Sequence, residues 1–171
     1  MYELFVPNRP TKDQRTLDAM APEVREDYLR ARAQIDAQTS TVGLERFRAA
    51  MAYEKAFVDA GGVLGAGVDP TGNGGALPGY GDQRNFELLR EAGFTPEQVV
   101  QIMTLNGAKI LGADRDLGSV AAGKIADLVL IRGDLTADPS AIRQVVTVFR
   151  DGIGYDTVRM LQSVRGRVGI D

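Results

Sequence analysis

The sequence of 171 residues contains neither cysteine nor histidine. The absence of cysteine excludes a disulfide framework and thiol chemistry. The absence of histidine removes the commonest general base near neutral pH and the commonest zinc ligand. A complete enzyme built from these residues alone would have to work with carboxylates, lysines and hydroxyls.

Strong charge and long apolar runs are absent as well. The formal net charge is −3, which predicts no binding to nucleic acid. No run of about 18 apolar residues occurs, so we expect no membrane span. Residues 1–6 show no basic segment before an apolar stretch, so we expect no signal peptide there, and the localisation stays open.

Apolar periodicity predicts helices in the first third of the chain. One helix is expected over residues 22–35, where Pro22 suits the first helical position. A second is expected over residues 41–60, because Gly61 and Gly62 follow as helix-ending residues.

The next segment reads as part of an α/β unit. The run Val63–Val68 is apolar on both faces, which predicts a buried parallel strand. Asp69 ends the run, a glycine-rich loop follows over residues 71–81, and a short helix is expected over residues 83–91. A long helix, a buried strand, an acidic residue, a loop and a helix are typical of one unit of an α/β barrel.

The predicted secondary structure changes from helical to β-rich after Gly112. A helix is expected from the Thr95–Gln98 capping sequence to Gly112, with Pro96 at its first position. Residues 125–131 and 145–149 then read as strands, and the second leads into an Asp-Gly hairpin turn.

The segment Gly118–Lys124 has the spacing of a phosphate-binding loop, but its context argues against nucleotide binding. Ile125 stands where such a loop needs serine or threonine, and a strand is expected to follow instead of a helix. We therefore expect no nucleotide site.

Asp69 is the strongest candidate for chemistry. A carboxylate at the carboxyl end of a barrel strand faces the active site, where it can bind a cation or accept a proton from water. An Asx-type turn before Pro70 is the alternative that the local sequence leaves open. A single carboxylate cannot form a metal site, and the remaining aspartates show no ligand spacing.

Several segments resemble the amidohydrolase superfamily. Gly65-Ala-Gly-Val-Asp69-Pro is similar to its last barrel strand, and Thr104-Leu-Asn-Gly-Ala-Lys-Ile-Leu-Gly112 to the helix that follows. Leu117-Gly-Ser-Val-Ala-Ala-Gly-Lys-Ile-Ala-Asp-Leu-Val-Leu130 resembles the start of its small β-sandwich, and Val148-Phe-Arg-Asp-Gly152 the final hairpin. The resemblance covers residues from about 60 to 155 and is closest to imidazolonepropionase-like and dipeptidase-like members.

This resemblance implies an α/β fold. Residues 1–113 would be the C-terminal fragment of a TIM-like (β/α)8 barrel, and residues 114–171 part of the small β-sandwich domain. It also implies a metal-dependent hydrolase of amide, peptide or cyclic amide bonds, in which Asp69 is both catalytic residue and metal ligand. Zinc is the metal expected in the complete protein. The family's other ligands, mostly histidines, have no match, so we expect this chain alone to hold no metal and to be inactive.

Three further residues are predicted to contact a small amide or peptide substrate. Asn73, Tyr80 and Arg84 lie in or near the loop expected over the barrel mouth. Arg84 is suited to pair with a substrate carboxylate, although a surface arginine is the alternative. The alternative function is a non-catalytic module that packs against a partner chain, and an incomplete barrel would favour self-association.

Overall fold

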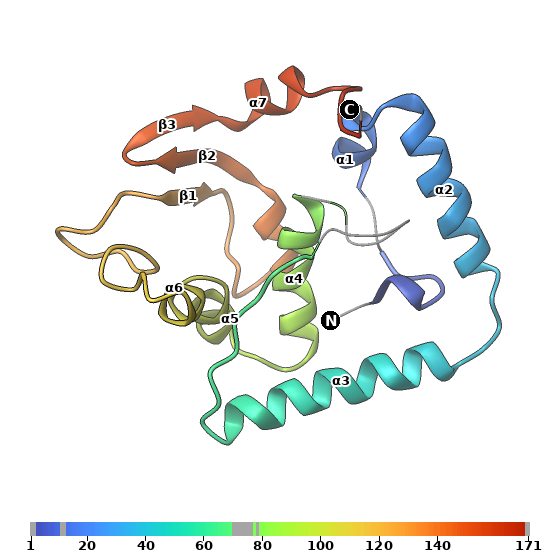
Figure 1. Cartoon of the computed structure of the whole chain (residues 1–171), viewed down its shortest axis with the longest axis horizontal. Coiled ribbons are helices and arrows are strands. Elements are labelled where there is room, and N and C mark those ends of the chain that lie inside the picture. Colours follow the sequence, from blue (N-terminus) through green and yellow to red (C-terminus); the bar gives the residue numbers. More distant parts are fainter. Residues whose placement is uncertain (1–2, 11–12, 70–76, 78, 170–171) are drawn as a thin grey trace.

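A computed structural model of the whole chain describes residues 3–10, 13–69, 77 and 79–169. Helices α2 and α3 run around the outside, α4 stands near the centre, and the sheet lies on the far side of α4 from α2 (Figure 1). The elements are η1 (Glu3–Phe5), α1 (Gln14–Ala19), α2 (Pro22–Asp36), α3 (Val42–Asp59), α4 (Tyr80–Glu91), α5 (Pro96–Met103), α6 (Leu105–Ile110), β1 (Leu128–Ile131), η2 (Pro139–Arg143), β2 (Val145–Arg150), β3 (Ile153–Asp156) and α7 (Thr157–Ser163).

The two long helices predicted near the start are confirmed as α2 and α3. Pro22 occupies the first turn of α2. After α3 the backbone N–H of Gly61 bonds to the carbonyl of Val58 at 2.9 Å, and Gly61 has a φ of 90°. A helix that ends on a left-handed glycine is the pattern that the sequence indicated.

Helix α4 and the start of α5 also follow the prediction. α4 begins at Tyr80, three residues before the predicted start. At α5 the Thr95 hydroxyl accepts a hydrogen bond from the Gln98 N–H at 3.3 Å, and the Gln98 side chain accepts one from the Thr95 N–H at 2.9 Å. The predicted capping box is therefore confirmed.

The single helix expected up to Gly112 is wrong in its continuity, because the chain breaks at Thr104 into α5 and α6. The Thr104 hydroxyl donates to the carbonyl of Val100 at 2.6 Å, and its φ and ψ of −127° and −81° are not helical. A threonine hydroxyl that bonds one turn back competes with the helical ladder and bends the chain.

Strands β1, β2 and β3 form an antiparallel sheet in that order. The two predicted strands are confirmed, although β1 begins at Leu128. Asp151 and Gly152 turn the β2–β3 hairpin with φ of 49° and 78°, the pair of left-handed residues that a type I′ turn requires. Asp127 holds this turn, since its carboxylate accepts from the Asp151 N–H at 2.7 Å.

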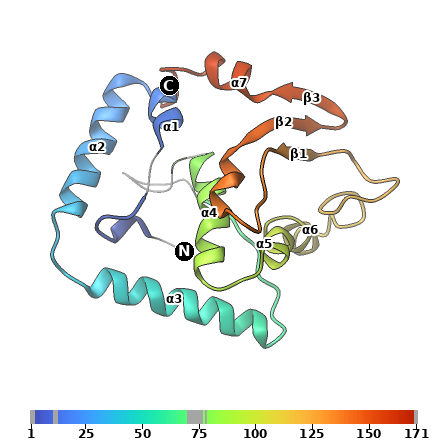
Figure 2. The same ribbon diagram turned by 180° about the vertical axis from the view of Figure 1, so that it is seen from behind.

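Helix α7 follows β3 and was not predicted. Asp156 caps it by accepting from the Arg159 N–H at 2.8 Å. The chain beyond α7 returns to the segment after α1, where Met20 and Val168 form a parallel bridge (Figure 2).

The strand predicted over Val63–Val68 is wrong, because these residues have no regular secondary structure. A parallel strand needs neighbours that bond to its edges, and the described residues supply no other strand there. Two side-chain amides bond to its carbonyls instead, from Asn85 to Gly67 and from Asn106 to Leu64.

Residues 1–113 were expected to form part of a barrel, but their described portion contributes helices and no strand. The structure is therefore mixed helix and sheet, and its described residues form no closed barrel. The boundary near residue 113 stays a prediction. No described helix is both long and apolar enough to cross a membrane.

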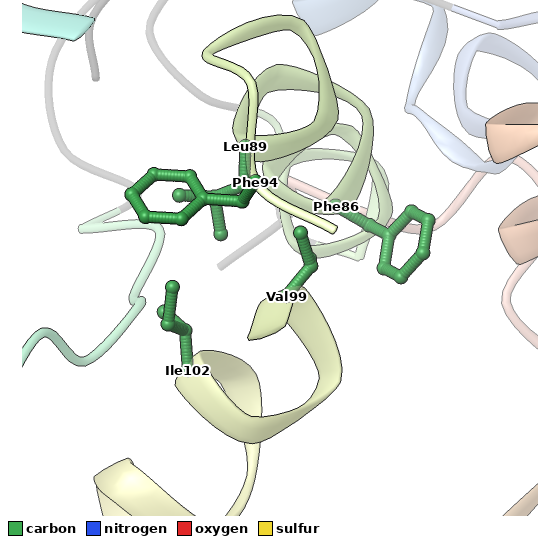
Figure 3. Close-up of a cluster of buried hydrophobic side chains, with 5 residues drawn as sticks. All are labelled: Phe86, Leu89, Phe94, Val99 and Ile102. Atoms are coloured by element: carbon green, nitrogen blue, oxygen red, sulfur yellow. The ribbon is translucent and has the colours of Figure 1, made fainter. Parts of the chain in front are cut away.

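The main buried cluster joins α4 to α5. Figure 3 shows Val99 and Ile102 of α5 lying across from Leu89 of α4 and from Phe94, with Phe86 beside them. All five side chains are almost fully buried, and partly buried Leu64 packs on them. Burial of a large apolar side chain is worth about 1.5–3 kcal/mol, so this cluster anchors the segment that leads to Asp69.

Candidate functional site

Asp69 lies at the exposed end of the segment over residues 63–69. Its φ is 44°, in the left-handed region that aspartate adopts more readily than most residues other than glycine. The structure thus places the predicted catalytic carboxylate on the surface, at the end of a segment without regular secondary structure.

Two asparagine side chains bond to the backbone before Asp69. The amide of Asn106, at the start of α6, donates to the carbonyl of Leu64 at 2.8 Å. The amide of Asn85, on α4, donates to the carbonyl of Gly67 at 3.0 Å. The segment is thereby tied to both helices that pack around it.

Tyr80 is almost fully buried at the start of α4. Its hydroxyl donates to the carbonyl of Pro10 at 2.5 Å, and the Arg143 guanidinium lies 5.1 Å from the centre of its ring. Burial raises the pKa of Tyr80 above its usual value, although Arg143 and Arg84 oppose this by stabilising the phenolate. Tyr80 is therefore a neutral hydrogen-bond donor near neutral pH.

Arg84 is 9% exposed, so it is not a surface arginine. Its Nε and Nη2 donate to the two carboxylate oxygens of Glu3 at 2.6 and 3.0 Å, and its Nη1 donates to Glu87 at 2.5 Å. Burial alone would lower the pKa of Arg84, but these bonds to Glu3 and Glu87 more than offset it and raise the pKa. All three nitrogens of the guanidinium are thus engaged by glutamates of the chain.

These pairs belong to a longer series, here called the ion-pair chain, whose members are Arg9, Glu3, Arg84, Glu87 and Arg143. Arg9 donates to Glu3 at 2.8 Å, and Arg143 binds both oxygens of Glu87 at 2.6 and 2.7 Å. The ion-pair chain joins η1, α4 and the end of η2. Opposite charges alternate along it, which is how buried charges are tolerated in proteins.

Sequence reasoning did not find Glu3, Glu87 or Arg143. Glu87 lies three residues after Arg84 on one helix, and this spacing is a signal that was available. Glu3 lies 81 positions from Arg84, and Arg143 lies 56 positions from Glu87, so no local pattern connects them.

The predicted site residues are brought together only in part. Tyr80 and Arg84 are linked through Arg143, which contacts the Tyr80 ring and shares Glu87 with Arg84. Asp69 ends a different segment, and Asn73 lies outside the described residues. The catalytic and substrate-binding roles of all four stay predictions.

The described residues do not fit a metal ion. Across residues 3–10, 13–69, 77 and 79–169, no group of three or more histidine, cysteine, aspartate or glutamate side chains is arranged to hold one. The sequence has no histidine or cysteine at all, and divalent metals of hydrolases usually take three or more protein ligands. We therefore assign no catalytic step through a metal to this chain.

Known proteins share sequence with this chain over limited stretches. A 5′-deoxyadenosine deaminase from Methanobrevibacter smithii is 30% identical over 77 residues, which are 43% of this chain and 18% of that protein. Adenine deaminase 3 from Rhizobium meliloti is 48% identical over 50 residues, which are 29% of this chain and 8% of that protein. The matches thus span less than a fifth of these curated relatives.

The fold has relatives among solved structures. An amidohydrolase from Thermotoga maritima is similar with a TM-score of 0.52 and 26% identity, over 62% of this chain and 26% of that chain. The sequence profile of the amidohydrolase family matches residues 34–154, well over half of the chain. The chain therefore belongs to the amidohydrolase family.

Proposed function

We propose that this chain is the C-terminal portion of a metal-dependent amidohydrolase that breaks carbon–nitrogen bonds. The observation that carries the proposal is the family match over residues 34–154 in a sequence that contains no histidine. The match spans only part of each relative, so the ligands of a divalent metal, zinc by expectation, would lie in a remainder of the protein.

The reaction class follows from the relatives and from the family. Deamination and amide hydrolysis are the same net change: an oxygen of water bonds to the carbon, the carbon–nitrogen bond breaks, and a proton passes to the leaving nitrogen. A carboxylate that accepts the proton from water and returns it to nitrogen performs both transfers. We assign this role to Asp69, whose exposure leaves room for a substrate at the end of its segment.

The architecture in this proposal has two parts. Residues 1–113 would belong to a (β/α)8 barrel and residues 114–171 to a small β-sandwich, with Asn73, Tyr80 and Arg84 beside a small amide or peptide substrate. Arg84 would reach a substrate carboxylate only if one of its pairs with Glu3 or Glu87 opened, since these pairs engage all its nitrogens. Support for the fold comes from the similarity to the amidohydrolase structure.

A second candidate function is a non-catalytic module that packs against another chain. It is favoured by apolar side chains that stand exposed on one face of the sheet, with Val129 at 56%, Tyr155 at 43% and Ile153 at 61% exposure. Contiguous exposed apolar surface of this kind marks sites of association.

Zinc binding and turnover of the purified chain test the first proposal. We expect no turnover of adenine, dipeptides or acylated amino acids with added Zn²⁺, because the described residues do not provide a ligand set. Stoichiometric zinc retained through dialysis, with turnover that a chelator abolishes, would contradict the proposal that this is an incomplete portion.

The upstream coding sequence separates the two candidates. An in-frame extension that encodes a His-x-His pair and further histidines, and that gives chelator-sensitive hydrolysis when expressed with this chain, supports the enzyme. An extension without histidines leaves the interaction module as the better account.

A further inference from the structure

The segments that resemble the amidohydrolase family contain residues that the chemistry of Asp69 does not explain. Asn106 lies in one of them, and Asn85 lies on α4. We propose that Asn85 and Asn106 are positioning residues, whose side-chain amides hold the backbone of residues 64–67 and thereby set where Asp69 lies. The inference rests on the proposed catalytic role of Asp69.

Asn106 is the buried anchor. It is 8% exposed, and its amide donates to the Leu64 carbonyl while its own carbonyl oxygen accepts from Gln101 at 3.3 Å. Asparagine is suited to this place because one side chain both donates and accepts. The chain breaks at Thr104 and starts a new helix, α6. This break places Asn106 in the first turn of α6.

Close packing holds the same region. A Cβ added to Gly65 would lie 2.8 Å from Cδ1 of Ile110, so the segment runs close to α6 and a larger residue there would displace the end of the Ile110 side chain. Gly118 has a φ of 83°, and a Cβ there would lie 2.6 Å from Cβ of Ala108. The loop at Gly118 therefore packs against the helix that carries the anchor. The positive φ and the close contact both require glycine at position 118 of the family-like segment.

Asn85 is the second anchor, although its side chain is not buried deeply enough to need a hydrogen-bond partner within the protein. The side chain is only half-buried, so water could satisfy its amide, yet it donates to the carbonyl of Gly67, 18 residues earlier. Gly67 is two residues before Asp69. Asn85 lies on α4, which Phe86 and Leu89 fix in the main core. Sites held from rigid helices are more precise than sites on loops alone.

The anchors take the place of a sheet ladder. Residues 63–68 form no strand, so the two amides hold a backbone that would otherwise be free to move. The left-handed φ of Asp69 is of the kind that persists only where surrounding contacts determine it.

Solution NMR of the full 171-residue chain tests the proposal with the variants Asn85→Ala and Asn106→Ala. In the unmodified chain we expect backbone order parameters of about 0.85 for residues 64–68 and a strong intraresidue N–H to Hα NOE at Asp69, the sign of a positive φ. In each variant we expect order parameters below about 0.6 there and a weakened NOE.

Thr157→Val is the matched control. The Thr157 hydroxyl also donates to a backbone carbonyl, that of Val145 at 2.8 Å, but it lies in the β-rich part. This variant should lower the melting temperature without changing the signals of residues 64–69. Unchanged order parameters and NOE in Asn85→Ala would overturn the proposal, and this variant decides alone if Asn106→Ala fails to fold. No hydrolysis is measured, so the outcome is independent of whether the chain belongs to an active enzyme.

Discussion

At the residue scale, the most consequential side chain for stability is Arg84. Replacing it with methionine removes three donors and leaves the carboxylates of Glu3 and Glu87 partly unpaired in a buried place. Breaking a buried ion pair on one side typically costs about 3–5 kcal/mol. We therefore expect Arg84→Met to lower the free energy of unfolding by about that amount, or to leave the chain unfolded, as measured by urea titration.

The control for this prediction is Arg30→Ala. Arg30 pairs with Asp27 one turn away, and both side chains are largely exposed. Exposed pairs contribute about 0–1 kcal/mol. Equal effects of the two substitutions would show that the ion-pair chain does not stabilise the fold.

Asp69→Asn separates the chemical role of this residue from a turn role. Asparagine keeps the shape and tolerates the left-handed backbone, but it has no charge and no proton affinity. We expect the melting temperature of the chain to be unchanged. In an extended, active form of the protein we expect kcat to fall by about 10²–10⁴, the usual worth of general acid–base catalysis. Unchanged kcat with a lowered melting temperature would leave Asp69 as a turn residue.

At the element scale, the cap of α1 predicts a dependence on pH. Asp13 accepts from the Thr16 N–H at 2.9 Å and pairs with Arg15. Burial alone would raise the pKa of Asp13, but these bonds lower it below its usual 3.8. A lowered folded-state pKa means that the stabilisation is present above the unfolded pKa and is lost as the pH falls through the folded value.

We therefore expect the free energy of unfolding to fall less in the Asp13→Asn variant than in the unmodified chain when the pH is lowered from about 6 to about 2. Asparagine is an equally good N-cap, so stability near neutral pH should change little. Urea titrations at both pH values measure the difference. An identical pH dependence in the two proteins would mean that Asp13 does not contribute to acid unfolding.

The elements show what could be predicted from sequence and what could not. Local signals were enough for α2, α3, the capping box at Thr95 and the Asp-Gly hairpin, because each depends on residues a few positions apart. The run Val63–Val68 was misread because an apolar segment becomes a strand only if other strands pair with it. The break at Thr104 was missed because a threonine inside an apolar helical pattern gives a weak signal.

The candidate site divides in the same way. Asp69 could be singled out because it ends an apolar run that reads as a barrel strand, and the family resemblance strengthened that choice. The engagement of Arg84 by Glu3 could not be predicted, since the two residues are 81 positions apart and only the folded chain brings them together.

At the scale of the whole molecule, the exposed apolar side chains of the sheet are the feature with the clearest consequence. Val129 of β1 pairs with Val148 of β2, and Val148 pairs with Tyr155 of β3. Two residues further along β2, Arg150 pairs with Ile153 of β3. Because strand side chains alternate, Val129, Tyr155 and Ile153 share one face. The largely exposed Val129 and Ile153 make this face apolar and leave these side chains accessible to another copy of the chain.

We expect the purified chain to self-associate through this face, with a molar mass that rises with concentration in size-exclusion chromatography with light scattering. The double variant Val129→Lys with Ile153→Lys should shift this rise to at least about tenfold higher concentration, since burying an unpaired ammonium costs more than 1.4 kcal/mol. Leu111→Lys is the control, because Leu111 is 82% exposed but lies after α6 and not on the sheet. A compact monomer at every concentration, melting cooperatively, would count against both self-association and the view that this chain is an incomplete portion of its barrel.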